Sequence, residues 1–348
     1  MDDGVAAQKE QAEVTQDITL AEEIRRQARA RGDACALLCE GRATSYGAFD
    51  VHASQVAQGL IGAGVAPGDR VAYLGKNSDY YFELLIGAAK AGAVAVPVNW
   101  RLAAPEIAYI LGDAAPKLLV VEPAFAPQAG AGAPAVRVID STAFAAWRDA
   151  QNDADPRRDA AYDQPVLQLY TSGTTGHPKG AVLSHRSLLS LRHRFPASRQ
   201  PAWNRWQASD VSLIGMPVFH ISGTGWGIWS LQHGAKGIVV REFDPHAVLD
   251  LLVEHRISKI MMVPTAMRIV LEHPRARETD FGFLENIYYG GAPIAPDLLR
   301  QGMEVFGCGF VQMYGMTETA GTVVGLPPAD HRPDSPRLAS VGVPLPGV

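Results

Sequence analysis

The sequence predicts an α/β fold with mostly parallel sheets. Helix-like segments alternate with short apolar, strand-like segments along the 348 residues, and 47% of the residues are hydrophobic, which is enough for a large core. The 34 glycines and 24 prolines indicate many tight turns between short elements. A chain of this length is expected to form two lobes, with ligands bound in the cleft between them at the carboxyl ends of strands.

Each predicted helix is followed by an apolar strand. Apolar side chains recur at intervals of four or seven residues on one face of each of the first two helices, namely Leu20, Ile24 and Ala28, and then Phe49, Val56 and Leu60. Glycine ends both helices. The helix and strand pairs are, in order, 19–32 with 35–39, 45–64 with 71–74, 80–90 with 93–98, 105–111 with 117–121, and 251–257 with 258–264. This order favours parallel strands joined by helices.

The remaining segments are expected to lie at the surface. Residues 1–17 are polar and acidic, lack the features of a secretory signal, and are predicted to form a disordered tail. Residues 126–135 and 148–163 are poor in large apolar side chains and are predicted to be surface connections. Because no apolar run approaches the roughly 20 residues that span a bilayer, we expect no integral membrane segment.

Composition narrows the class of partner. The formal net charge of -5 is spread along the chain, with no basic stripe for a nucleic acid to bind. The three cysteines do not provide a disulfide framework, which favours a reducing compartment and hence a cytoplasmic protein. We therefore expect small-molecule ligands and no nucleic acid.

Residues 170–180, YTSGTTGHPKG, carry the clearest chemical signal. Glycines expose backbone N–H groups, hydroxyls donate hydrogen bonds and lysine adds positive charge, so the segment is predicted to hold phosphates. The residues expected to do so are Thr171, Ser172, Gly173, Thr174, Thr175, Gly176 and Lys179. The segment is not a Walker loop, because Pro178 stands where that motif needs glycine. Composition alone leaves a flexible Ser/Thr/Gly loop as the alternative. Residues 181–190, AVLSHRSLLS, follow this segment and are predicted to form a helix.

This segment is similar throughout its length to the phosphate-loop signature of adenylate-forming enzymes, the superfamily of acyl-CoA synthetases, adenylation domains and luciferases. Three later segments resemble the family's acyl-site segment, adenine-side loop and YGxTE segment: 216–220 (MPVFH), 289–293 (YGGAP) and 312–319 (QMYGMTET). The resemblance implies that residues 18–348 form the large N-terminal AMP-binding domain. That domain has layered parallel-sheet lobes with helices between them and a smaller β-barrel-like subdomain.

The resemblance also implies ligands and residue roles. The ligands are ATP, Mg²⁺, a carboxylic acid and coenzyme A. Glu318 would hold the metal, Thr317 the α-phosphate and Tyr314 the adenine, and the implied catalytic set is Thr317, Glu318, His220 and Lys179. The nucleotide would also contact Gly291, Ala292, Pro293 and Gly315, together with the phosphate loop. The acid would contact His220, Gly225, Trp226, Gly290, Gly315 and Met316.

The region around His220 predicts features of the acid. Amino-acid-activating relatives carry an aspartate near this position, so histidine here indicates an acid without an α-amino group. Gly223, Gly225 and Gly227 do not have the spacing of a dinucleotide fingerprint. Trp226 and Trp229 are predicted to be pocket walls or core rather than catalysts, because indoles are large apolar side chains with one donor.

The chain departs from the family pattern at its end. The sequence stops before the family's ribose-binding aspartate, hinge and small C-terminal domain with its catalytic lysine, so we expect that domain to be absent from this chain. Two functions follow. The first is an acyl-CoA synthetase that activates a fatty or aromatic acid through an acyl adenylate; the second is a truncated, non-catalytic nucleotide and acyl-binding fragment. The sequence does not determine the oligomeric state, and a homodimer is possible.

Overall fold

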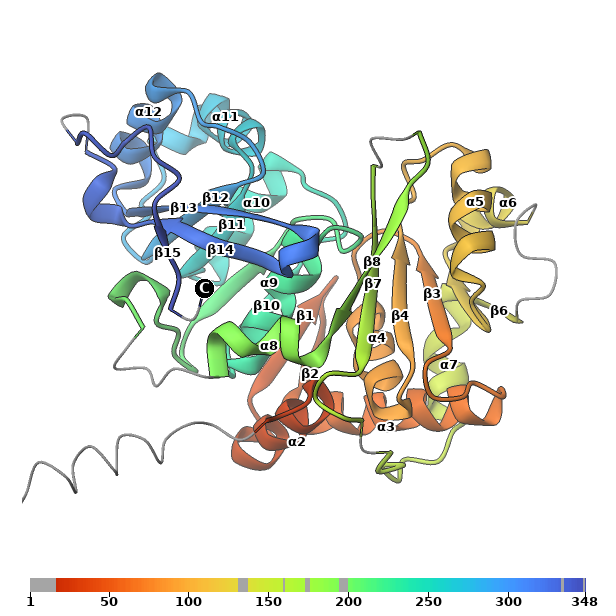
Figure 1. Cartoon of the computed structure of the whole chain (residues 1–348). Coiled ribbons are helices and arrows are strands. Elements are labelled where there is room, and N and C mark those ends of the chain that lie inside the picture. Colours follow the sequence, from red (N-terminus) through yellow and green to blue (C-terminus); the bar gives the residue numbers. More distant parts are fainter. Residues whose placement is uncertain are drawn as a thin grey trace, which may run out of the picture.

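The computed structural model describes residues 17–130, 137–158, 160–172, 176–193, 200–332, 335–346 and 348. The described strands lie in two sheets with helices between and around them (Figure 1), so the predicted α/β class is confirmed. Except for Asp17, the predicted N-terminal tail lies outside the described residues, and the predicted domain boundary beside it stays a prediction.

The larger sheet has nine strands. Their order is β15 (Val343–Pro344), β14 (Gly321–Leu326), β13 (Gly309–Met316), β12 (Asn286–Gly290), β11 (Lys259–Met262), β9 (Val211–Ile214), β10 (Lys236–Val239), β1 (Cys35–Cys39) and β2 (Arg42–Ser45). The strands from β13 to β1 run parallel, and the strands beyond them at the two edges pair antiparallel. The carboxyl ends of the parallel strands therefore share one edge, where ligands bind in open α/β sheets.

The smaller sheet has six strands. Their order is β6 (Arg137–Asp140), β5 (Leu118–Val121), β3 (Arg70–Leu74), β4 (Val94–Val98), β7 (Pro165–Thr171) and β8 (Lys179–Ser184). All pairs are parallel except β7 with β8, which form a hairpin around the predicted phosphate loop. The sequence predicts a helix directly after that loop, which is wrong for its first residues. Ala181, Val182 and Leu183 instead pair with β7, and the helix begins at His185.

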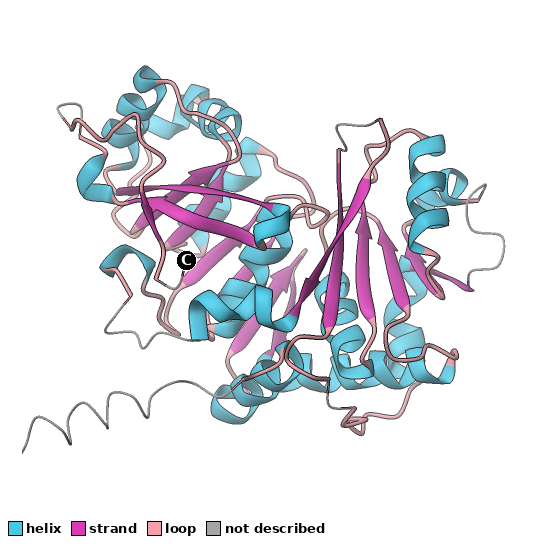
Figure 2. Ribbon diagram, viewed as in Figure 1, coloured by secondary structure: helices cyan, strands magenta, loops and turns pink. Residues whose placement is uncertain are grey.

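The helices and sheets stack in five layers (Figure 2). The largest core lies between the sheets and includes buried residues of α2 (Leu20–Arg31), α3 (Tyr46–Gly62), α4 (Asp79–Ala91), α7 (Phe144–Asp149), α8 (His185–His193) and α9 (Ile221–Gln232). A second core packs α10 (Pro245–Glu254), α11 (Pro264–Glu272) and α12 (Pro296–Phe306) on the outer face of the larger sheet. A third packs α5 (Ala104–Ala114) and α6 (Ala126–Ala129) on the smaller sheet. No described pairing closes either sheet, so the barrel-like subdomain stays a prediction.

Local sequence explains the central helices. Ser45 and Ser78 accept backbone hydrogen bonds at the starts of α3 and α4, and Gly92 ends α4 in the left-handed conformation. A Cβ at Gly87 would lie 2.4 Å from Val56, so glycine is what lets these two helices approach closely. The helices predicted at 45–64 and 80–90 are thus confirmed, with their boundaries moved by one or two residues.

The charged connection at 148–163 is not simply a surface segment. Arg148 is buried and pairs with Glu83 of α4 at 2.7 Å. Further along, Asp155 accepts hydrogen bonds from Arg25 at 2.7 Å and from Lys90 at 3.0 Å. The described residues of this segment after Arg148 are exposed or half-buried, as predicted, but its charged side chains also neutralise charges that the helices would otherwise bury alone.

His185 joins the start of α2 to the start of α8. Its Nδ1 accepts a hydrogen bond from the backbone N–H of Leu20 at 3.1 Å, and burial lowers its pKa from 6.5 to about 4. The folded state therefore binds a proton less readily than the unfolded state. Stability is complete above about pH 6.5 and decreases as the pH falls toward 4.

We expect up to about 3 kcal/mol of folding free energy to be lost across this pH range through His185. Replacing His185 with glutamine keeps an acceptor for Leu20 but removes the titration. Thermal unfolding midpoints between pH 7 and pH 4 are expected to fall less steeply for His185→Gln than for the native chain. Equal slopes for the two proteins would contradict the assignment.

No helix in the described part of the chain combines the length and apolar composition needed to cross a membrane.

Candidate active site

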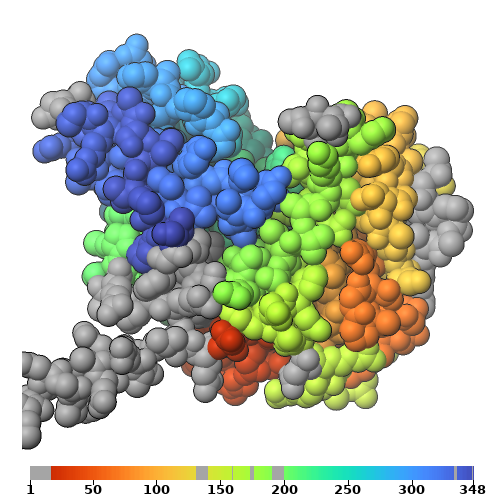
Figure 3. All heavy atoms as spheres, viewed as in Figure 1, coloured from red at the N-terminus to blue at the C-terminus, as the bar shows by residue number. Residues whose placement is uncertain are grey.

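A cavity of about 520 Å³ lies where the end of β7 faces strands β13 and β14 of the larger sheet. Helix α9 and the short turn η6 (Thr317–Thr319) complete its walls. In the space-filling view the blue C-terminal residues meet the light green residues around β7 and β8 (Figure 3), and β8 contacts η6. The predicted site residues that line the cavity are Thr171, Ser172, His220, Gly225, Trp226, Gly291, Gly315, Met316, Thr317 and Glu318.

The turn η6 presents Thr317 and Glu318 to the cavity. Thr319, whose role the sequence does not reveal, fixes this turn: its hydroxyl oxygen accepts from Met316 N–H at 3.0 Å, and the hydroxyl lies 2.7 Å from the carbonyl oxygen of Gly321. A hydroxyl three residues after Met316 is a recognised local capping pattern. A Cβ at Gly315 would lie 1.9 Å from the Gly321 carbonyl oxygen, so only glycine fits where β13 enters the turn.

The phosphate loop connects two paired strands. Thr171 and Lys179 are cross-strand partners in the hairpin, so the loop's two ends are held side by side. Lys179 is exposed and does not itself line the cavity, and Gly176 adopts a φ of +94°. The predicted phosphate ligands Gly173, Thr174 and Thr175 lie outside the described residues. The ring of His177, near the second end of the loop, stacks on the ring of Tyr109 in α5 with the ring centroids 4.8 Å apart.

The predicted adenine side follows β12. A Cβ at Gly290 would lie 2.3 Å from the carbonyl oxygen of Met313, so Gly290 packs between strands instead of lining the cavity. Gly291 lines the cavity, whereas the exposed Ala292 and Pro293 lie beyond its walls. Tyr314 is 54% exposed, which leaves its ring free to stack on a ligand.

His220 immediately precedes α9 at the wall of the cavity. Its side chain is open to the cavity, but the surrounding walls desolvate the ring, and this burial together with the positive charge of Arg101 lowers its pKa. A neutral imidazole is therefore expected at pH 7. A Cβ at Gly223 would lie 2.2 Å from the carbonyl oxygen of Pro217, so this glycine lets α9 start against the preceding loop.

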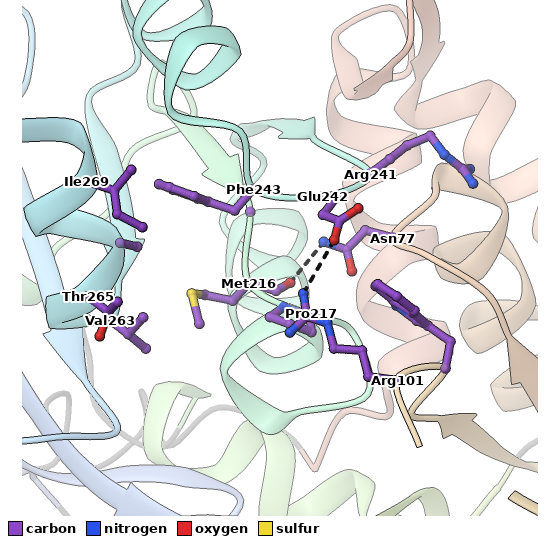
Figure 4. Close-up of a pocket in the computed structure, with 13 residues that line it drawn as sticks. Asn77, Arg101, Met216, Pro217, Arg241, Glu242, Phe243, Val263, Thr265 and Ile269 are labelled. Carbon is purple, nitrogen blue, oxygen red and sulfur yellow. Dashed lines mark hydrogen bonds and ion pairs between the residues drawn. The ribbon is translucent and has the colours of Figure 1, made fainter. Parts of the chain in front are cut away.

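A second cavity of about 200 Å³ adjoins the first. Met216 and Val263 line both cavities. In Figure 4, Arg101 and Glu242 lie on the opposite side of this second cavity from Val263. The Arg101 guanidinium and the Glu242 carboxylate form an ion pair at 3.8 Å. Asn77 donates a hydrogen bond to the carbonyl oxygen of Met216 at 3.1 Å and so holds the loop between the two cavities. The sequence does not predict this cavity, because its residues come from five separate segments that only the fold brings together.

The predicted metal residue suits Mg²⁺. Among the described residues no group of three or more His, Cys, Asp or Glu side chains converges, so the structure shows no all-protein metal cage. Glu318 instead offers one carboxylate at the cavity wall, with no ion pair to any other described residue. Mg²⁺ commonly binds through one or two carboxylates together with substrate phosphates. The donor set present is therefore the one expected for a magnesium nucleotide.

The family model for AMP-binding enzymes matches residues 24–348. The chain belongs to the AMP-binding enzyme family. This confirms the resemblance to adenylate-forming enzymes, whose layered domain the two sheets reproduce.

Individual members of the family are similar to this chain over most of its length. Fatty acid–[acyl-carrier-protein] ligase ScoC of Streptomyces coeruleorubidus is 44% identical over 90% of this chain and 61% of its own length. Feruloyl-CoA synthase of an Amycolatopsis species is 36% identical over 92% of this chain and 63% of its own length. This chain thus spans about three-fifths of the length of these relatives. An inhibitor-bound N-terminal domain of FACL13 from Mycobacterium tuberculosis superposes with a TM-score of 0.83 and 29% identity, covering 93% of this chain and 81% of that one.

Proposed function

We propose that this chain is the large domain of an ATP-dependent ligase. The ligase would activate a fatty or aromatic carboxylic acid as an acyl adenylate and then transfer the acyl group to the thiol of coenzyme A, with AMP as the leaving group and loss of the thiol proton. The observation that carries the proposal is the cavity that brings Ser172, His220 and the Thr317–Glu318 turn into one space. Relatives named as a fatty acid ligase and a feruloyl-CoA synthase support the two acid classes.

In the proposed reaction, a carboxylate oxygen attacks the α-phosphorus of ATP, and pyrophosphate leaves. Thr171, Ser172 and Lys179 would bind the departing phosphates, and Thr317 would donate a hydrogen bond to the α-phosphate. Glu318 would hold Mg²⁺, which supplies positive charge along the phosphates. Such catalysis is mostly positioning and charge stabilisation. A neutral His220 would orient the acid by one hydrogen bond. A charged histidine would instead form an ion pair with the carboxylate and weaken the carboxylate as a nucleophile.

The second cavity suits the thiol acceptor. It touches the first cavity at Met216 and Val263, so an extended arm lying there would reach an acyl group held beside His220. Arg101 at its wall is half-exposed and would attract an anionic carrier. Coenzyme A is the proposed acceptor, and the relative named as an acyl-carrier-protein ligase makes a carrier protein the alternative.

The proposal is tested by offering both acceptors. The chain is incubated with Mg-ATP and an acid from a fatty and aromatic panel, followed by coenzyme A or a phosphopantetheine-loaded carrier protein. We expect an acyl thioester on coenzyme A. Thioester on the carrier protein alone would make a carrier protein, and not coenzyme A, the acceptor. No AMP or adenylate with any acid would favour the second function, a non-catalytic nucleotide and acyl-binding fragment, over an active ligase.

Trp226 supplies a test of the acid site. Its indole N–H donates to the carbonyl oxygen of Leu213 at 3.0 Å, which fixes the ring as a cavity wall. Replacing Trp226 with alanine widens the cavity, so we expect relative activity to shift several-fold toward bulkier acids. Competition between benzoic acid and the bulkier 2-naphthoic acid measures the shift, and an unchanged preference would remove Trp226 from the acid site.

A homodimer and a cytoplasmic location stay predictions.

A further inference from the structure

The inner end of the cavity is closed by aromatic rings. Trp226 and Trp229 line the cavity, and each is only 3% exposed. Trp206 does not line it but contacts both of these rings, with ring centroids 5.0 Å from Trp226 and 6.0 Å from Trp229. We call these three residues the tryptophan seal. Trp206 thus forms a second layer behind the cavity wall.

Further contacts hold the seal in place. Tyr288 packs against Trp226 with ring centroids 5.0 Å apart, and its hydroxyl donates to the carbonyl oxygen of Trp203 at 2.5 Å. The hydrogen bond of Trp226 to Leu213 ties the same ring to strand β9. Rings fixed from several sides do not easily rotate to admit a longer ligand.

Charged groups lie behind the seal. The ammonium group of Lys259 lies 5.6 Å from the centroid of the Trp206 ring. It forms ion pairs with Asp210 at 2.8 Å and with Glu285 at 2.7 Å, and both Lys259 and Asp210 are almost fully buried. An alkyl chain that passed Trp206 would have to displace or desolvate these charges, which is unfavourable.

The cavity must also hold a nucleotide. Its volume of about 520 Å³ includes the walls at Thr317, Glu318 and Gly291, which are assigned to ATP in the proposed function. Pockets of roughly 300 to 1,000 Å³ usually hold a single drug-sized ligand. Only part of this volume remains for the acyl group.

We propose that the tryptophan seal restricts this enzyme to compact acyl groups, aromatic rings or short to medium alkyl chains, and that Trp206 is the residue that sets the limit. This inference rests on the proposed function, because it concerns the acid that shares the cavity with ATP. Trp206 does not touch the acid in the native protein. It acts by holding the rings of Trp226 and Trp229 in place. Long-chain acids are excluded by it.

Binding of acyl sulfamoyladenosines tests the inference without requiring turnover, because these compounds mimic the acyl adenylate and are not consumed. Dissociation constants are measured by calorimetry for the benzoyl, hexanoyl and hexadecanoyl compounds. We expect the native chain to bind the first two at least tenfold more tightly than the third. Equal or tighter binding of the hexadecanoyl compound would overturn this inference while leaving the proposed ligase intact. Binding of none of the three would overturn both.

Variants then identify Trp206 as the limiting residue. Trp206→Ala is expected to tighten hexadecanoyl binding at least tenfold while leaving hexanoyl binding within about threefold, because an alkyl chain can then fill the vacated space. Trp206→Phe retains a ring and should keep the native ratio even where the alanine variant is unstable. Trp147→Ala, the same change in α7 away from the cavity, serves as the matched control. An unchanged ratio in a folded Trp206→Ala protein would refute the role of Trp206.

Discussion

Replacing Glu318 with alanine lowers acid-dependent ATP–pyrophosphate exchange by at least about 100-fold, the loss typical of removing one group that stabilises developing charge. Glu318 is the carboxylate that the turn η6 presents to the cavity, and the described residues provide no cluster to replace it as a metal ligand. The measurement is exchange at saturating acid across a magnesium titration. Because Glu318 is at the surface of the cavity and not in a core, its loss is expected to leave thermal unfolding unchanged.

The matched control is Glu304→Ala, which removes an exposed carboxylate from α12 outside the cavity and should retain native exchange. Native exchange in the Glu318 variant at ordinary magnesium concentrations would show that this carboxylate does not serve the metal. Loss of exchange together with a lower unfolding temperature would indicate a structural role instead.

Replacing Lys90 with methionine destabilises the fold by about 3 kcal/mol, the lower end of the cost of removing one partner from a buried ion pair. The Lys90 side chain is fully buried, and its ammonium group lies 2.5 Å from Asp50 Oδ1, 3.0 Å from Asp155 Oδ2 and 2.8 Å from the Ser54 hydroxyl. Without it, the carboxylate of Asp50 loses its buried cation. Urea unfolding followed by circular dichroism measures the loss as a lower midpoint.

The control for this change is Lys117→Met, the same substitution at an exposed position before β5. It is expected to shift the free energy of unfolding by less than about 0.5 kcal/mol. A similarly small effect at Lys90 would mean that this buried ion pair contributes little to the packing of α3 against α4.

The fold class was predictable because apolar periodicity and glycine punctuation are local signals. These signals predict the helices beginning near Thr19, Ser45 and Tyr80, and the structure contains all three. The strand β8 was not, because it pairs only with the strand on the other side of the phosphate loop, and its apolar residues also suit a helix. Strand pairing is a non-local choice that the residues of one segment do not determine.

The site was predictable where one short segment carries several of its residues. Thr171 and Ser172 come from one motif and Thr317 and Glu318 from another, and the structure brings both motifs to one cavity. Trp206 was not predictable, since it lies in an irregular segment before β9 and its role depends on contacts with rings of α9. The second cavity could not be predicted either, because its lining residues come from separate segments that only the fold brings together.

The most direct test of the account is detection of the acyl adenylate itself. The chain is mixed with Mg-ATP and each acid of a panel that runs from benzoic and hexanoic to hexadecanoic acid, and the products are analysed by mass spectrometry. The account predicts an adenylate with compact acids, accompanied by an equal amount of pyrophosphate, and none above background with the longest acid. No adenylate with any acid, in a folded chain that binds ATP, would contradict the claim that this cavity activates carboxylic acids.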